Sequence, residues 1–383
     1  MGLREWWENF AFNESEDYSY FEIDDDHVIS THSASAEDFI PMRTYFELRL
    51  KQMFLKNQRV YTREFEPVAH VAVDFQFAGE RIQSPIIVGP SMLANVDKVS
   101  KGDQIEFLNI RIVGPCPYEG EDLKVFTGLF RMVTKDWTKR VLSLLETFSQ
   151  TFDSSHISSF INISKPLSDG IQGFIGLEDI EMRVGRYIQY AAPDMNSTGF
   201  GVLRPCFAVH LRKPSSEVVK ERFWVNEGRL HYGDSREELT EYDGADFMLL
   251  ELAPLATRGD YTGFDFHRKH WKKIESLLAE QKNDDAFATF KLLAAELVTC
   301  DDIILPHRAS LLKNYREQMD EWIKFYDELY STDRPGRQPI TAETQPRIKE
   351  LDEKDLQKAL EQDIEAETDV EYTPESILSK YTK

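Results

Sequence analysis

Two stretches of this sequence share one pattern of apolar and polar residues, and the prediction of the fold starts from them. Residues 122–152 have the pattern of a buried strand, a short turn and an amphipathic helix, and residues 246–278 repeat that order. An Asp-aromatic-Thr triplet follows the strand in each, beginning at Asp136 and at Asp260. The repetition predicts two related strand-and-helix units packed in one body.

The middle of the chain shows the two-residue alternation that is typical of half-buried strands. Residues 67–77 alternate, Gly79 turns the chain, and residues 81–88 are the predicted return strand. The segment 114–120, GPCPYEG, is predicted to be a loop rich in helix and strand breakers. Further strands are expected at 104–113, 174–190, 205–212, 222–225, 229–232 and 247–253.

The three strands between residues 205 and 232 are expected to form a meander. Its last two strands are linked by Asn226-Glu227-Gly228, a hairpin loop with glycine where a positive φ is needed.

Helical spacing governs other parts of the sequence. Residues 36–56 are apolar without a clean period, and a helix is favoured after Met42. Thr134 can cap a helix that extends to residue 152. Further helices with apolar stripes are predicted at 3–12, 267–281, 284–300 and 308–331. The last is aromatic around much of its circumference, so it is either deeply buried or used to hold a partner.

The order of these elements predicts an α+β fold: two related antiparallel sheet units flanked by helices, a C-terminal helical layer and an acidic helical tail. Since 383 residues exceed the usual size of a single core, the chain could form one large domain or two closely packed domains. The expected segments are an N-terminal helical and acidic part (1–66), a first sheet-plus-helix unit (67–160), a second sheet unit with its helical layer (161–331), and a linker with a docking tail (332–383).

Charge and cysteine content indicate which classes of partner are expected and in which cellular compartment the protein is found. A net charge of −22 repels polyanions, which makes nucleic acid an unlikely partner of the whole chain. Cys116, Cys206 and Cys300 are widely spaced and form no C-x-x-C pair, which argues for a reducing compartment. The sequence has no apolar run of eighteen residues, and its first residues are acidic. It therefore predicts a cytoplasmic protein without a membrane segment.

The most chemical-looking cluster is Asp260, Asp265, His267 and His270, because a carboxylate and two imidazoles within ten residues suit a divalent transition metal. The H-x-x-H spacing lacks the glutamate of a hydrolytic zinc helix, and the neighbouring cations oppose metal binding. A solvated helix start is therefore favoured. No catalytic residue, metal ligand, cofactor or small-molecule ligand is assigned.

The same run carries the concentrated basic patch of the chain. It consists of Arg268, Lys269, Lys272 and Lys273 around Trp271. A nucleic-acid backbone or an acidic peptide would fit such a patch. The charge of −22 favours a surface helix, or an internal partner for the acidic segments of this chain.

Apolar side chains near both ends are candidates for holding a protein partner. The tail after residue 331 has too little apolar surface to fold alone, and we expect it to dock on its own body or on another protein. The candidate partner-binding residues are Trp6, Trp7, Phe10, Trp322, Tyr326, Ile377, Leu378 and Tyr381.

Strong structural patterning without a catalytic signature predicts a non-enzymatic interaction or scaffolding component of an intracellular multi-protein assembly. Its terminal segments would be docking elements, and its partners would be other proteins or copies of itself. The alternative is a hydrolase or nuclease whose site forms only in three dimensions around His267, His270 and Asp265, so enzymatic activity stays open.

Overall fold

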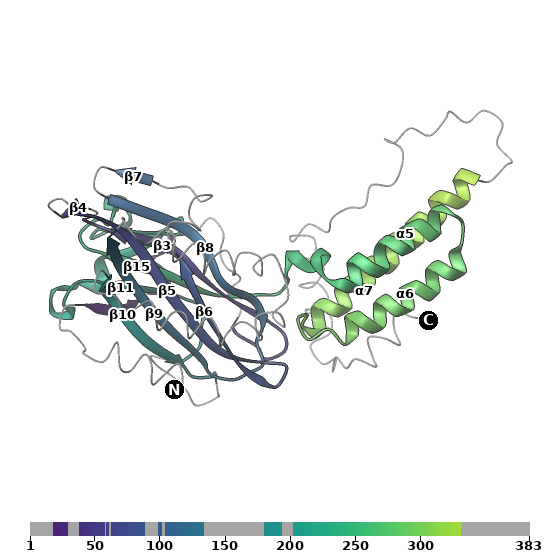
Figure 1. Cartoon of the computed structure of the whole chain (residues 1–383), viewed down its shortest axis with the longest axis horizontal. Helices are drawn as coiled ribbons and strands as arrows, with labels where there is room; N and C mark the ends of the chain where they lie inside the picture. Colours follow the sequence, from purple (N-terminus) through teal and green to yellow (C-terminus); the bar gives the residue numbers. More distant parts are fainter. Residues whose placement is uncertain are drawn as a thin grey trace. The chain divides into compact units, whose positions relative to one another are not determined.

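The computed structural model of this protein describes residues 18–29, 38–57, 59–60, 63–88, 99–101, 104–133, 180–193 and 202–330. The contacts divide the chain into two compact units, Met1–Leu255 and Ala256–Lys383. In the described residues every strand belongs to the first unit, here called the sheet unit, and the three α-helices belong to the second, the helical unit (Figure 1). The mixed α+β class, with helices after the sheets, is therefore confirmed.

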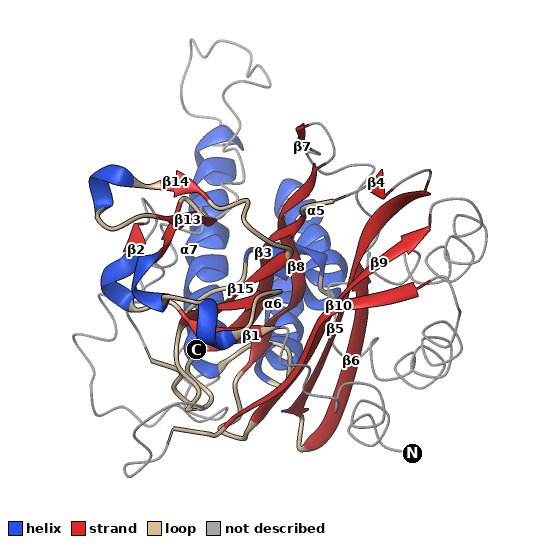
Figure 2. Ribbon diagram, turned by 90° about the vertical axis from the view of Figure 1, so that its left-hand side faces the viewer, coloured by secondary structure: helices blue, strands red, loops and turns tan. Residues whose placement is uncertain are grey.

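A six-stranded antiparallel sheet is the largest layer of the sheet unit (Figure 2). Its strands come from both ends of that unit, so its order differs widely from the chain order. In spatial order they are β1 (Ser19–Glu22), β11 (Cys206–Leu211), β15 (Phe247–Leu255), β3 (Tyr45–Leu55), β8 (Gln104–Pro117) and β7 (Val99–Lys101).

Strand β3 stands where the sequence favoured a helix after Met42, so that prediction was wrong. Nine of its eleven residues are buried, and they point to both faces of the sheet. The middle of β3 does alternate, because Glu47, Arg49 and Lys51 are interleaved with leucines. At both ends of the strand, however, consecutive residues are buried, so the alternation covers too few positions to identify the strand.

Strand β8 also corrects the prediction, because it continues through Gly114 to Pro117 where a loop was expected from residue 114. Gly114 has a φ of +100°, and a Cβ atom there would lie 2.5 Å from the carbonyl oxygen of Phe46 on β3. The glycine thus permits a close approach of two strands. Among described residues β7 pairs only with residues 104–106 of β8, so Pro115 and Pro117 interrupt no ladder on that edge.

A second antiparallel sheet contains the strand and hairpin predicted most clearly from alternation. Residues Ala78 and Gly79, with φ of 52° and 75°, form the predicted turn between β5 and β6. The helix expected over residues 134–152 lies outside the described residues. The strands are β10 (Ile180–Tyr190), β9 (Leu123–Val133), β5 (Arg63–Phe77) and β4 (Arg59–Val60), with β6 (Glu80–Val88) paired to β5.

The two larger sheets pack face to face around one hydrophobic core. Alternate residues of each strand enter this core, which is the arrangement of a β-sandwich. Fully buried members include Leu50, Val71, Val73, Val125, Leu129 and Leu250.

A small third sheet covers part of the other face of the six-stranded sheet. The predicted hairpin loop is confirmed, since Glu227 and Gly228 have φ of 49° and 75°. The meander was wrong, because β11 pairs with β1 and β15 and not with the hairpin. The strands are β14 (Thr240–Glu241), β13 (Arg229–Tyr232), β12 (Phe223–Asn226) and β2 (Val28–Ile29), and short 3-10 turns lie at Asp25–His27, Ser215–Glu217, Lys220–Arg222 and Arg236–Glu238.

The helical unit has its own core, and its three predicted helices are confirmed to within a few residues. Trp271, Phe290, Leu293, Leu312 and Tyr315 are among its buried members. None of the helices in the described part of the chain is long and apolar enough to cross a bilayer. The elements are a 3-10 segment η6 (Gly259–Gly263), a π-helix η7 (Phe266–Trp271), α5 (Lys272–Ala279), α6 (Asn283–Val298) and α7 (Leu305–Tyr330).

Candidate functional site

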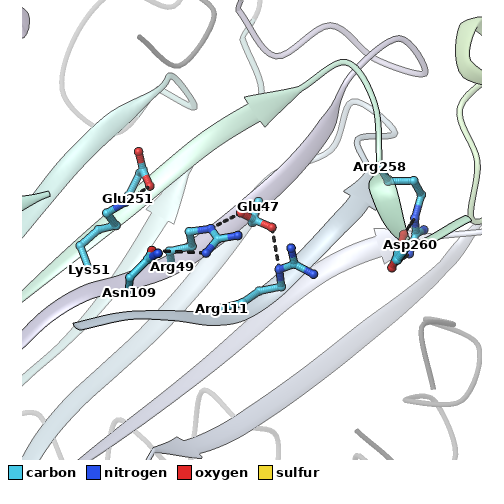
Figure 3. A network of polar contacts seen from close by, with 8 residues as sticks. All are labelled: Glu47, Arg49, Lys51, Asn109, Arg111, Glu251, Arg258 and Asp260. Atoms are coloured by element: carbon cyan, nitrogen blue, oxygen red, sulfur yellow. Dashed lines mark hydrogen bonds and ion pairs between the residues drawn. The ribbon is translucent and has the colours of Figure 1, made fainter. Parts of the chain in front are cut away.

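Charged side chains form a ladder on one face of the six-stranded sheet (Figure 3). Three of them lie at alternate positions of β3, so they share that face. We call the group the polar face; it consists of Glu47, Arg49, Lys51, Asn109, Arg111 and Glu251.

Glu47 is the centre of the polar face. Its side chain is 5% exposed and forms ion pairs with Arg49 and with Arg111, the latter at 2.8 Å between Nε and Oε2. Arg49 and Arg111 lie directly opposite each other on β3 and β8, and like charges in that position repel. Lys51 Nζ is 3.2 Å from Glu251 Oε2. Each cation of the polar face therefore has a carboxylate partner, and the group is suited to fixing strand register.

We expect Glu47→Gln to lower the free energy of unfolding by about 2 kcal/mol, because two arginines would then face each other with no charge between them. Urea unfolding followed by circular dichroism measures the loss. Glu241→Gln is the matched control. The Glu241 side chain is 43% exposed, so its ion pair with Arg229 should contribute under about 1 kcal/mol. Equal losses in the two variants would contradict this role of Glu47.

A hydrogen-bonded tyrosine pair joins β1 to β10, on different sheets of the sandwich. Tyr20 Oη lies 3.1 Å from Tyr190 Oη and donates to Glu22 Oε1 at 3.2 Å, so the proton between the two phenols comes from Tyr190. Arg204 Nη2 donates to Glu22 Oε2 at 2.8 Å. The chain of contacts ties together strands that are 170 residues apart in sequence.

The groups around this pair are held in their neutral forms. Burial, followed by the nearby Arg186, lowers the pKa of His210 to about 3. Burial, followed by Glu22, raises the pKa of the Cys206 thiol to about 12. Thr127 Oγ1 is 3.2 Å from His210 Nδ1. At neutral pH the cluster thus offers hydrogen bonds, whereas a thiolate or an imidazolium would be needed for nucleophilic or acid catalysis.

A hollow beside Tyr118 is too small for an organic ligand. Its volume is about 240 Å³ including the open mouth, below the roughly 300–1,000 Å³ of ligand pockets. Phe46, Phe75 and Leu123 line it, and the buried Tyr118 hydroxyl has no hydrogen-bond partner among the described residues. Burial, followed by Asp122 and Glu121, raises the pKa of Tyr118 to about 12. The space suits a single water molecule.

The structure gives the histidines of the H-x-x-H run different partners. His267 Nδ1 lies 2.7 Å from Tyr315 Oη, while His270 Nε2 lies 3.0 Å from Glu296 Oε1. Asp265 is exposed. Burial, followed by Lys272, lowers the pKa of His267 to about 4. Within the described ranges no group of three His, Cys, Asp or Glu side chains is placed to hold a metal ion.

A buried arginine anchors the turn between α6 and α7. Arg258 is 2% exposed and donates twice to Asp260, from Nε at 2.6 Å and from Nη2 at 2.8 Å. Its Nη1 donates to the backbone oxygen of Asp302 at 2.8 Å, and its guanidinium lies 4.7 Å from the ring centre of Phe264. Next to it His307 is fully buried, and burial, followed by Arg258, lowers its pKa to about 3.

Of the candidate partner-binding residues, only two lie in the described part of the chain, both on α7. Tyr326 is 8% exposed and belongs to the helical core. Trp322 is half-buried, and its ring centre is 5.5 Å from that of Tyr326. Trp6, Trp7, Phe10, Ile377, Leu378 and Tyr381 lie outside the described residues.

The comparisons with known proteins identify no relative: no protein-family model matches the chain, and neither a curated protein nor a solved structure is significantly similar to it. The tyrosine pair, the polar face and Arg258 were all missed by sequence reasoning. Tyr20 and Tyr190 have no local signature, because each needs a partner from a distant strand. Arg258 and Asp260 are two residues apart, but burial is what distinguishes them from a surface pair.

Proposed function

We propose that this protein is a non-enzymatic interaction or scaffolding component of a multi-protein assembly. The observation that carries the proposal is the end of α7, which extends beyond α5 and α6 (Figure 1). At 26 residues α7 is about 39 Å long, against about 24 Å for the 16 residues of α6. Trp322, Phe325 and Leu329 form a half-buried stripe along this end.

Self-association is the form of assembly that this stripe supports best. Its members are spaced at i, i+3 and i+7, so they lie on one side of the helix. A stripe of this kind can pack against the same stripe of a second copy, because a two-fold contact requires one self-complementary surface. Aromatic side chains are enriched at the centres of such interfaces.

We expect the full-length protein to have a mass above the 44.5 kDa of one chain in size-exclusion chromatography with light scattering at micromolar concentration. The double variant Trp322→Ala/Phe325→Ala should shift it toward one chain, because hot-spot aromatics lose about 2 kcal/mol or more on truncation. Leu292→Ala is the control, since Leu292 is a lone exposed apolar residue on α6 at 57% exposure. A single-chain mass throughout, up to roughly 100 µM, would refute self-association.

Several finer predictions belong to this proposal. The similar sequence pattern of residues 122–152 and 246–278 supports the prediction of two related units. We also propose segment boundaries at residues 66, 160 and 331, and a cytoplasmic location. In this proposal the terminal segments are the parts that dock on partners. The hydrolase or nuclease alternative at His267, His270 and Asp265 predicts a stoichiometric metal ion in the purified protein, which metal analysis would detect.

A further inference from the structure

The start of α5 and the preceding π-helix present one strongly basic surface in a strongly acidic protein. Arg268, Lys269, Lys272 and Lys273 are all exposed. The opposite side of the same segment is buried, through Trp271 in the helical core. We call these four cations the basic face.

The basic face is only partly neutralised by the described residues around it. Lys269 Nζ is 4.0 Å from Glu296 Oε1, at the limit of an ion pair, and Asp265 is exposed at the start of the segment. Lys272 lies near enough to the Glu275 carboxyl to interact with it electrostatically, but neither Lys272 nor Lys273 forms an ion pair with another described residue. Lys273, and Lys272 in part, thus remain available for an anionic partner at the surface.

The chain itself contains a segment of complementary charge. Residues 350–371 carry ten Asp and Glu side chains against two lysines, a net charge of −8 in 22 residues. The protein as a whole has a charge of −22, so its field disfavours nucleic acid, whereas an acidic segment tethered to the same chain has a high effective concentration.

The length of the chain permits the contact. The ring centre of Trp271 is 4.8 Å from that of Tyr315, which places the start of α5 level with Tyr315. Tyr315 lies fifteen residues before the end of α7 at Tyr330, or about 22 Å along the helix. Nineteen residues separate Tyr330 from residue 350, and they can span up to roughly 60 Å.

We propose that residues 350–371 dock on the basic face of the same chain, with carboxylates next to Lys272 and Lys273. The contact deepens the proposed function, because it names the partner of the C-terminal docking segment. It does not depend on the stripe of α7, so each can fail without the other. Attraction between exposed charges is screened by salt, and at 1 M salt the screening length is about 3 Å. The docked state should therefore open in high salt.

Carbodiimide cross-linking of the full-length protein tests the contact, because it joins a lysine to a carboxylate that touches it. A mixture of unlabelled and ¹⁵N-labelled chains distinguishes links within one chain from links between two. We expect mass spectrometry to find links within one chain from Lys269, Lys272 or Lys273 to residues 350–371. Because Lys272→Glu/Lys273→Glu removes two of these amines, the yield compared between variants is that of the Lys269 links. It should fall at least about fivefold in this double variant and in 1 M NaCl.

The matched control is Lys220→Glu/Arg236→Glu, which makes the same change of charge at two exposed cations of the sheet unit. It should leave the yield unchanged, and light scattering should give both double variants the mass of the parent. Equal yields in the two double variants would overturn the proposal. So would links found only between two chains, or binding of a single-stranded oligonucleotide that Lys272→Glu/Lys273→Glu abolishes in fluorescence anisotropy.

Discussion

Lowering the pH from 7 to 5 is expected to destabilise the sheet unit by about 4 kcal/mol. Two of its histidines, His70 and His210, are 2% and 0% exposed, and burial lowers their pKa values to about 4 and about 3. In the unfolded chain the pKa of histidine is about 6.5. Below pH 6.5 the unfolded state therefore binds protons that the folded state excludes.

The sign and size of the effect follow from this difference in proton binding. Each buried imidazole contributes stability that is complete above about pH 6.5 and is lost as the pH falls toward its folded pKa. The loss is about 1.4 kcal/mol per pH unit and per histidine, or about 2 kcal/mol each at pH 5. A domain with a total stability of about 5–15 kcal/mol would lose much of its margin in this mild range. His307 adds a similar dependence to the helical unit.

Urea unfolding between pH 7.5 and 5.0, followed by circular dichroism, measures this slope. In His210→Asn the slope of the sheet unit below pH 6.5 should fall from about 2.8 to about 1.4 kcal/mol per pH unit, because one titrating group is gone. The same replacement at the half-buried His231 is the control. If His210→Asn unfolds with the same pH dependence as the parent, proton exclusion at His210 is not the cause.

The elements that could be predicted are those whose signal lies within a few consecutive residues. The alternation over 67–77, the turn at Gly79 and the Glu227-Gly228 hairpin report their own local structure. The helices α6 and α7 carry apolar stripes over 16 and 26 residues, long enough for the period to be clear. Local backbone preference and side-chain period agree in these elements.

Strand order could not be predicted, because it depends on pairings between distant segments. β3 pairs with β8 and β15, and the Leu48–Leu252 pair joins residues about two hundred positions apart. Since consecutive residues are buried at both ends of β3, the composition of those ends is equally compatible with a buried helix. The meander failed for a related reason: β11 and β12 are neighbours in sequence, but they belong to different sheets and pack in one core between them instead of pairing.

Residues of the histidine run differ in burial, although nothing in the sequence distinguishes them. A solvated helix start was favoured for residues 267–273, and its cations are indeed exposed. His267 is half-buried against Tyr315, a residue on a helix that begins nearly forty positions later. The distinction rests on which side of the π-helix faces the core, and the spacing of two histidines does not contain that information.

Replacing Arg258 with methionine is expected to cost the helical unit about 3–5 kcal/mol of stability. The side chain of Arg258 is 2% exposed, and it holds both Asp260 oxygens and the backbone oxygen of Asp302. Methionine fills much of the same volume without a charge or a donor. The Asp302 side chain, 9% exposed, would lose a cation 3.9 Å away, and its backbone oxygen would lose a hydrogen bond. Removing the arginine leaves the buried groups of Asp302 unmatched, whereas Asp260, at 30% exposure, keeps some contact with water.

The sheet unit contains a surface copy of this arrangement, which isolates the role of burial. Arg222 pairs with both oxygens of Asp234 and lies 4.4 Å from the ring centre of Tyr232, but the arginine is 38% and the aspartate 67% exposed. Arg222→Met should therefore cost under about 1 kcal/mol, because water replaces the lost partner. Thermal and urea unfolding of the two variants give the comparison. Similar losses at Arg258 and Arg222 would mean that the contacts themselves, and not their removal from water, set the stability of the α6–α7 turn.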